Sequence, residues 1–185
     1  MNVRDEQRER ATTALAAHLL RTGLSQASVR QLAAAAGISD RMLLYYFTDK
    51  TEALALAMAR LAGDMARQLE MALPAGETLS QPALTAKAAR LVIGADFRPF
   101  MRLWIEAVAA AARGEAPFVD IAQQIAAGFL AWIEARLDPE TPDPAGVAAV
   151  VLAVLDGLAL VEVCAGGDRA TLAVEALERA AYRQA

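Results

Sequence analysis

The side chains best suited to binding another molecule lie in one short segment near the amino terminus. Arg41, Met42, Tyr45 and Tyr46 fall within a single predicted helix, and Lys50 follows it. Arginine, lysine and tyrosine donate hydrogen bonds to phosphate oxygens, and arginine also reads base edges in the major groove of DNA. This segment therefore predicts a nucleic-acid-binding surface.

The elements that must position these side chains are two short helices joined by a turn. Ser28 and Gln31 have the spacing of a capping box, in which each side chain satisfies a backbone amide of the other residue. Gly37 stands where a positive φ would end the first helix, and Ser39 can cap the second helix, at residues 40–47. The pattern predicts a helix-turn-helix whose second helix enters the major groove. Helical hairpins with a glycine also occur in proteins that do not bind DNA.

The rest of the chain predicts an all-α fold of about nine helices. Hydrophobic residues make up 56% of the 185 positions, alanine and leucine are abundant, and the alternation typical of strands is scarce. Gly and Pro clusters separate the helical segments, and Asp168 is expected to cap the last one. The expected helices cover residues 4–21, 29–35, 40–47, 50–73, 83–95, 98–113, 117–137, 145–165 and 168–183.

The charge is divided unevenly along the chain. The net charge is −4, yet residues 1–50 carry seven basic and five acidic residues and the remainder carries 11 basic and 17 acidic residues. A basic head on an acidic body is typical of a DNA-binding module joined to a part that does not touch DNA. We therefore place a DNA-binding domain at 1–49 and an effector-binding and dimerisation domain at 50–185.

The cellular setting is predicted from the cysteine content and the longest apolar run. Cys164 is the only cysteine, so the chain cannot form an internal disulfide, and we expect a cytoplasmic protein with this residue buried. The apolar run at 145–163 contains Asp156 and Glu162. An acid at a bilayer centre costs roughly 2.5–3.5 kcal/mol, so we expect a helix buried between protein helices and no membrane span.

Catalytic chemistry has little support in this sequence. His18 is the only histidine, and we expect it to be a packing residue rather than a catalytic base. No His, Cys and carboxylate spacing predicts a metal site, and no glycine-rich loop predicts a phosphate-binding cofactor site. We predict no catalytic residue, no metal and no cofactor.

The segment around the helix-turn-helix resembles the TetR family of bacterial transcriptional regulators. The resemblance covers about residues 19–54 and rests on four pieces of sequence: Gly23, Ser28-Val29-Arg30-Gln31-Leu32-Ala33, Ala36-Gly37-Ile38-Ser39 and Tyr45-Tyr46-Phe47-Thr48-Asp49-Lys50. The family usually has a tyrosine where this chain has Leu44, and small residues at positions 41 and 42. These departures predict an operator that differs in detail.

The resemblance implies roles for individual residues. Ser28 and Lys50 match phosphate-binding positions, and Arg30 matches a place from which some members reach a base. The predicted DNA-binding residues are Ser28, Arg30, Ser39, Arg41, Met42, Tyr45, Tyr46 and Lys50. The resemblance also implies a homodimer through the last two helices, at about 145–183. The apolarity of 145–165 independently favours such cover, because one further helix cannot bury most of its faces.

The resemblance further implies a cavity for a small-molecule effector among the fourth to seventh helices. Aromatic and methionine side chains at helical spacing are its candidate walls, although such stripes are also typical of plain core, and two charged residues are candidate polar anchors. The predicted effector-binding residues are Met58, Met65, Phe97, Met101, Arg102, Trp104, Glu106, Phe129 and Trp132. Few other buried charges are expected, which favours a mostly apolar effector.

We therefore predict a ligand-responsive regulator, a dimeric repressor that a small molecule releases from a palindromic DNA operator. Two other classes remain open at this stage. One is a helical protein-interaction module that uses the hairpin for partner contacts. The other is a small helical enzyme, which would depend on His18 or Glu106.

Overall fold

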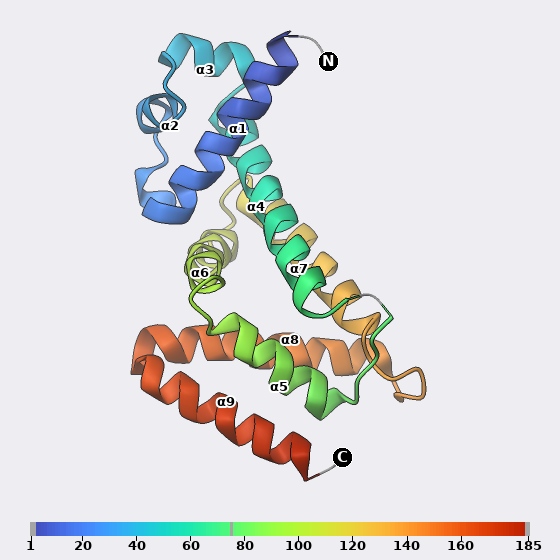
Figure 1. Ribbon diagram of the computed structural model, residues 1–185. Helices are drawn as coiled ribbons and strands as arrows, with labels where there is room; N and C mark the ends of the chain where they lie inside the picture. Colours follow the sequence, from blue (N-terminus) through green and yellow to red (C-terminus); the bar gives the residue numbers. More distant parts are fainter. Residues whose placement is uncertain (1–2, 75, 184–185) are drawn as a thin grey trace. The chain divides into compact units, whose positions relative to one another are not determined.

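The computed structural model is all-helical over the residues it describes, 3–74 and 76–183 (Figure 1). It confirms the predicted fold class and, within those residues, the nine α-helices. The helices are α1 (Val3–Thr22), α2 (Val29–Ala35), α3 (Asp40–Tyr46), α4 (Lys50–Ala72), α5 (Gln81–Val92), α6 (Arg98–Ala112), α7 (Phe118–Glu134), α8 (Pro144–Ala165) and α9 (Gly167–Tyr182), with a short 3-10 helix, η1 (Leu24–Gln26), between α1 and α2.

Four features differ from the sequence-based expectation, and one of them is the fifth helix, which spans Gln81–Val92 rather than 83–95. The η1 turn was not predicted. Asp168 lies in the first turn of α9 and does not cap it, because Gly166, with φ of 89°, occupies the cap position. The seventh helix ends at Glu134 rather than at residue 137, because the next residues pair with a distant segment: the Leu79 amide donates to the Arg136 carbonyl at 2.8 Å. Pairing of this kind is invisible to local periodicity.

The chain divides into two compact units. The first contains the residues up to Arg67 together with Arg102–Ile125, and the second contains Gln68–Met101 and the residues from Ala126 onward. Three long helices, α4, α6 and α7, therefore contribute residues to both units.

The first unit is built on α1, which packs against η1, α2 and α3. Leu15, Leu19, Leu32, Leu43 and Phe47 form its fully buried core. The first part of α4 adds a stripe of buried side chains at the predicted helical spacing. In the first unit this stripe consists of Leu54, Met58, Leu61 and Met65.

The second unit is centred on α5, α8 and α9, which lie side by side (Figure 1). Its core includes Leu84, Val151 and Val174. Arg90 of α5 donates through two nitrogens to the Glu178 carboxylate of α9, at 2.9 and 2.6 Å. This hydrogen bonding lowers the pKa of Glu178 below its usual value.

A buried arginine, Arg136, links the ends of two helices in the second unit. The Arg136 side chain is only 3% exposed, and its Nε donates to the Leu73 carbonyl at 2.8 Å. Its guanidinium pairs with Glu70 and lies over the Trp132 ring, 4.3 Å from the centroid. These contacts hold the end of α4 against the end of α7.

One face of α8 remains uncovered in the single chain. Leu160 and Val163 are 49% and 59% exposed, and Val150 and Val161 are exposed as well. Cys164 is also exposed, so the expectation of a buried cysteine was wrong for the isolated chain. Among the described residues, α8 is the single helix long and apolar enough to cross a membrane, with a mean hydropathy of 2.4. Core helices of soluble proteins meet the same criteria.

Candidate nucleic-acid interface

The first helix of the hairpin, α2, begins with the predicted capping box. The Ser28 hydroxyl accepts from the Gln31 amide at 3.3 Å, and the Gln31 side chain accepts from the Ser28 amide at 3.0 Å. The Ser28 hydroxyl also donates to the same Gln31 oxygen at 2.6 Å. Ser28 is exposed, and its hydroxyl already caps the start of α2.

The turn between the helices has the backbone geometry that the glycine predicted. Gly37 has φ of 67°, a left-handed conformation that is easiest for glycine. Its amide donates to the Ala34 carbonyl at 3.1 Å, and the Ile38 amide reaches back to the Ala33 carbonyl at 3.0 Å. The chain then enters α3, where the Ser39 hydroxyl accepts from the amide three residues later at 3.2 Å.

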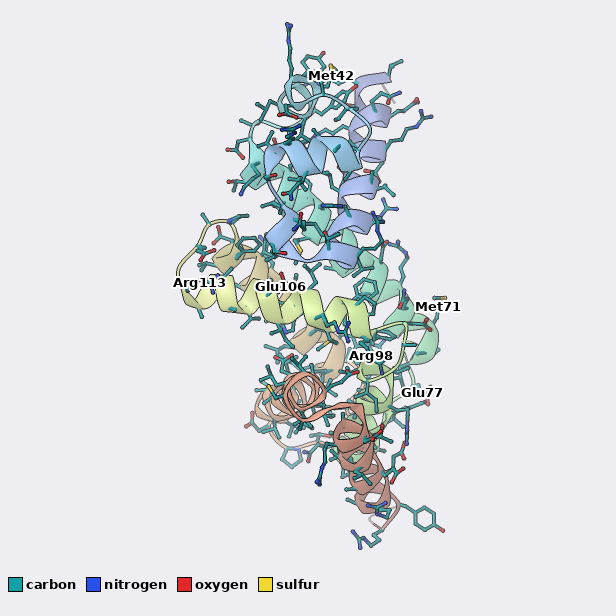
Figure 2. The ribbon with its side chains drawn as sticks, turned by 90° about the vertical axis from the view of Figure 1, so that its left-hand side faces the viewer. Met42, Met71, Glu77, Arg98, Glu106 and Arg113 are labelled. Atoms are coloured by element: carbon teal, nitrogen blue, oxygen red, sulfur yellow. The ribbon has the colours of Figure 1, made fainter. Side chains whose placement is uncertain are left out.

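The sequence of α3 fixes which side chains face outward. Leu43 and Phe47 are fully buried against the first unit, so the helix cannot rotate without losing that burial. Arg41 is exposed and Tyr45 is 55% exposed, while the Met42 side chain is half-buried (Figure 2). Leu44, the departure from the family pattern, is also exposed at 49%.

The two adjacent tyrosines form an aromatic pair at the end of α3. Their ring centroids lie 5.6 Å apart, and the planes are tilted by 59°. Tyr46 is half-buried where Tyr45 projects outward. This face offers guanidinium, phenol and apolar groups together, a combination that can bind phosphates and base edges. Arg30 of α2 and Lys50 of α4 are exposed as well.

Arg4 is a contributor to this site that the sequence analysis missed. Its guanidinium lies over the Tyr45 ring, 4.9 Å from the centroid, and its Nη2 donates to the Tyr45 carbonyl at 3.1 Å. The contact spans 41 residues of sequence, so spacing gave no signal of it. An arginine in the first turn of α1 therefore supports an aromatic side chain on α3.

The start of α4 is tied to α1 through a second charged contact. Asp49 accepts from the Glu52 amide at 2.8 Å, and the Glu52 carboxylate accepts from the Thr48 amide and pairs with Arg8. The hydrogen bond from Thr48 is the main reason why the pKa of Glu52 falls below its usual value. Arg8 also lies over the Phe47 ring, 5.6 Å from its centroid.

These contacts surround a surface cavity of about 460 Å³ in the first unit. Its walls come from α1, α3, the following turn and α4. The lining residues are Arg4, Asp5, Arg8, Leu44, Tyr45, Tyr46, Thr48 and Glu52. The cavity is lined by two arginines and two carboxylates, so its charges balance and give it no net positive charge to attract anions.

The predicted effector-binding residues fall in both units. The first unit holds Met58, Met65, Arg102, Trp104 and Glu106; the second holds Phe97, Met101, Phe129 and Trp132. The methionines and Phe97 are buried, whereas the two tryptophans and Phe129 are half-buried and the two charged residues are exposed.

The hydrogen bonding of Trp132, Glu106 and Gln68 bears on an effector role. Among the described residues, the buried indole nitrogen of Trp132 has no hydrogen-bond partner, and neither has the buried side-chain oxygen of Gln68 in the same unit. Glu106 has a partner, since it accepts from the Leu24 amide at 2.6 Å.

His18 is half-buried and makes a hydrogen-bond contact within the first unit. Its Nε2 lies 2.8 Å from the Gln26 carbonyl, which links α1 to the end of η1. Among the described residues, no group of three or more His, Cys, Asp and Glu side chains could hold a metal ion.

The helix-turn-helix segment matches a known protein family. Residues 13–58, which contain α2, α3 and the start of α4, match the family described as bacterial regulatory proteins of the tetR family. A search of curated proteins found no match.

Solved structures resemble the chain over nearly its whole length. A transcriptional regulator from Rhodococcus sp. Rha1 is 27% identical, with a TM-score of 0.71 over 94% of this chain and 90% of that one. A TetR-family regulator from Cytophaga hutchinsonii has a TM-score of 0.78 at 15% identity, covering 97% and 94%. The multidrug binding protein EbrR, solved with proflavin, has a TM-score of 0.63 at 22% identity, covering 92% and 99%.

Proposed function

Because the chain belongs to the TetR family of DNA-binding transcriptional regulators, we propose that it is a ligand-responsive repressor. In this proposal a homodimer binds a palindromic operator, and a small effector releases it. The mechanism is a population shift, which requires the effector to bind the DNA-incompetent form more tightly than the DNA-bound form.

The observation that carries the proposal is the outward face of α3. Leu43 and Phe47 anchor the helix in the core, which leaves Arg41 and Tyr45 exposed on a rigid support. We assign base contacts to this face. Backbone phosphates would be bound by residues around it, including Ser28, Ser39 and Lys50. For Ser28, a phosphate contact would have to share or replace the hydrogen bond that its hydroxyl makes to Gln31.

We propose that α8 and α9 form the dimer interface. The support is the exposed apolar face of α8, which includes Leu160 and Val163. A methyl group on Gly157, midway along α8, would meet no atom within 4 Å, so that position is open to a second helix. A two-fold axis would place the recognition helices about 34–36 Å apart, or a multiple of that spacing, on successive major-groove faces.

We further propose that the effector is mostly apolar but carries hydrogen-bonding groups. The buried, unpartnered nitrogen of Trp132 can donate to it, and the unpartnered oxygen of Gln68 can accept from it. The multidrug binding protein EbrR, which has a similar fold, was solved with proflavin. Proflavin is aromatic, which agrees with a mostly apolar effector. Glu106 is the weakest of the predicted anchors, because its carboxylate already accepts a hydrogen bond from Leu24.

A mobility-shift assay on the promoter region of its own gene, or on DNA selected from a random pool, tests the operator proposal. Binding should weaken steeply as salt rises, because phosphate contacts release counterions. Lys50→Ala should lower the slope of log affinity against log salt by about 1.8, because the dimer loses two phosphate contacts of about 0.9 each. Tyr46→Ala should also weaken binding, and light scattering should show that both variants keep the mass of the unmodified protein.

Lys87→Ala is the matched control, since Lys87 pairs with Glu77 in the second unit. An unchanged slope in both lysine variants would contradict the phosphate assignment. Failure to bind any DNA, with capture of a protein partner through α3, would favour the interaction-module alternative.

A further inference from the structure

The corner between α1 and α2 is held by a residue far away in sequence. The chain leaves α1 at Gly23, whose φ is 73°, and enters η1 at Leu24. Gly23 occupies the cap position of η1 but has no side chain with which to cap it. The carboxylate of Glu106, a residue of α6 (Figure 2), takes that place. Its Oε2 accepts from the Leu24 amide at 2.6 Å.

The fit between Glu106 and Gly23 is close. A Cβ atom on Gly23 would overlap Oε1 of Glu106 and would lie 2.8 Å from Oε2. A Cβ atom does not approach an oxygen closer than about 3.0 Å, so the flexible Glu106 carboxylate would have to shift beside any larger residue. The left-handed φ of Gly23 adds a second reason for glycine at this position.

Further contacts connect this corner to the start of α2. The His18 ring bonds to the Gln26 carbonyl, and the Gln26 side chain is hydrogen-bonded to Gln31. Ala27 is buried, and Ser28 then caps α2. A shift of the corner at Leu24 would therefore be passed to the start of α2, which packs against α3.

From these contacts we propose that Glu106 is a positioning residue for operator binding. It touches no DNA in this proposal; it fixes the α1–α2 corner through the Leu24 amide and so fixes the placement of the recognition helix. The inference rests on the proposed role of α3 as the DNA reader. It makes Glu106 of α6 a determinant of DNA affinity, a role that is separate from the proposed binding of an effector.

The test compares Glu106→Ala with Glu106→Gln in the full-length protein. The alanine variant should bind operator DNA about tenfold more weakly, the scale of one lost hydrogen bond to a charged group. The glutamine variant should recover most of that loss, because its amide oxygen can still accept from Leu24. Glu115→Ala is the matched control, since it removes an exposed carboxylate from the loop after α6 without touching η1.

Amide hydrogen exchange at Leu24 provides a readout that a general loss of stability would not reproduce. Exchange there should accelerate in Glu106→Ala and stay slow in Glu106→Gln, while core amides such as those of Leu15 and Leu19 stay protected. Unchanged exchange at Leu24 in the alanine variant would refute the contact. Accelerated exchange with undiminished operator affinity would refute its positioning role.

Gly23→Ala approaches the same contact from the other side. The added methyl group should displace the carboxylate and weaken operator binding, and adding Glu106→Ala should cause little further loss. Additive losses would mean that the two residues act separately, which overturns the inference. Lys50→Ala separates this outcome from failure of the operator proposal. If Lys50→Ala weakens binding and Glu106→Ala does not, the DNA surface stands and the role of Glu106 falls.

Discussion

Helices α3 and α8 both expose side chains that the fold of the single chain does not need, but the chemistry of those side chains differs. On α3 the exposed groups include Arg41 and Tyr45. On α8 they include Val150, Leu160 and Val163. A polar and aromatic face on a helix with a secure core suits a charged, hydrogen-bonding partner such as DNA, whereas an aliphatic face needs another apolar surface.

The two helices also differ in what secures them. α3 is seven residues long, too short to be stable alone, and is held by its cap, its two core residues and the brace from Arg4. α8 has 22 residues, and the Asp143 side chain caps it by accepting from the Gly146 amide at 3.1 Å. The comparison implies that a change on the exposed face of α8 would affect the proposed dimer, whereas a change in α3 would affect the proposed recognition of DNA.

The largest effect should come from placing a charge on the uncovered face of α8. In Leu160→Asp, a carboxylate would be buried in the proposed dimer interface, so we expect monomers in light scattering. Operator affinity should fall by a factor of about 100 or more, because a dimer gains roughly 10²–10⁴ in avidity from its second head. Met71→Asp is the control, since Met71 is a 76% exposed residue of α4 that belongs neither to the DNA-binding residues nor to α8 and α9. A dimeric Leu160→Asp protein with full affinity would place the interface elsewhere.

Adjacent leucines on α3 sharpen the contrast between support and exposed face. Leu43 is fully buried and Leu44 is 49% exposed. Leu43→Ala should therefore lower the free energy of unfolding by about 2–5 kcal/mol, measured with urea, whereas Leu44→Ala should change it by less than about 0.5 kcal/mol. If Leu44→Ala alters operator affinity at unchanged stability, Leu44 replaces the tyrosine contact usual in the family. Equal losses of stability would contradict the orientation of α3.

Local signals account for how much of α3 and α8 could be predicted. The Ser28 capping box, the left-handed Gly37 and the Ser39 cap are all written within a few residues, so the hairpin was predictable nearly to the residue. The exposure of Cys164 was missed because an apolar helix looks buried in sequence even when the chain alone cannot cover it.

Long-range contacts account for what the sequence hid. The brace between Arg4 and Tyr45 and the cap that Glu106 provides for η1 join segments 41 and 82 residues apart. No periodicity or spacing rule connects such positions. Arg136, an ordinary charged residue in the sequence, proved to be a buried link between α4 and α7 for the same reason.

A smaller effect is expected at the brace itself. Arg4→Ala should weaken operator binding about threefold, in line with a cation–π contact of roughly 0.5–1 kcal/mol at an exposed site. In a Tyr45→Leu background the same change should cost nothing further if Arg4 acts only through the Tyr45 ring. Mobility shifts on the four proteins of this double-mutant cycle measure the coupling. A lower salt slope in Arg4→Ala would show instead that Arg4 binds a phosphate directly.

The smallest effect concerns how the stability of the first unit depends on pH. The hydrogen bond from Thr48 lowers the pKa of Glu52, so the folded protein binds its proton less readily than the unfolded chain does. The stabilisation is therefore present above the ordinary pKa of about 4.5 and is lost as the pH falls through the lowered value. Because the Glu52 side chain is about one-third exposed, we expect no more than about 1 kcal/mol.

Urea unfolding of Glu52→Gln at pH 7 and at pH 3 measures this contribution. The variant should be less stable than the unmodified protein at pH 7, and the difference should shrink as the pH is lowered, because the carboxylate of the unmodified protein then takes up its proton. Glu140→Gln, which removes an exposed carboxylate before α8, should show no such convergence. A difference that stays constant between the two pH values would assign the role of Glu52 to packing rather than charge. Any dependence of the free energy of unfolding on pH would then have to come from residues other than Arg8 and Glu52.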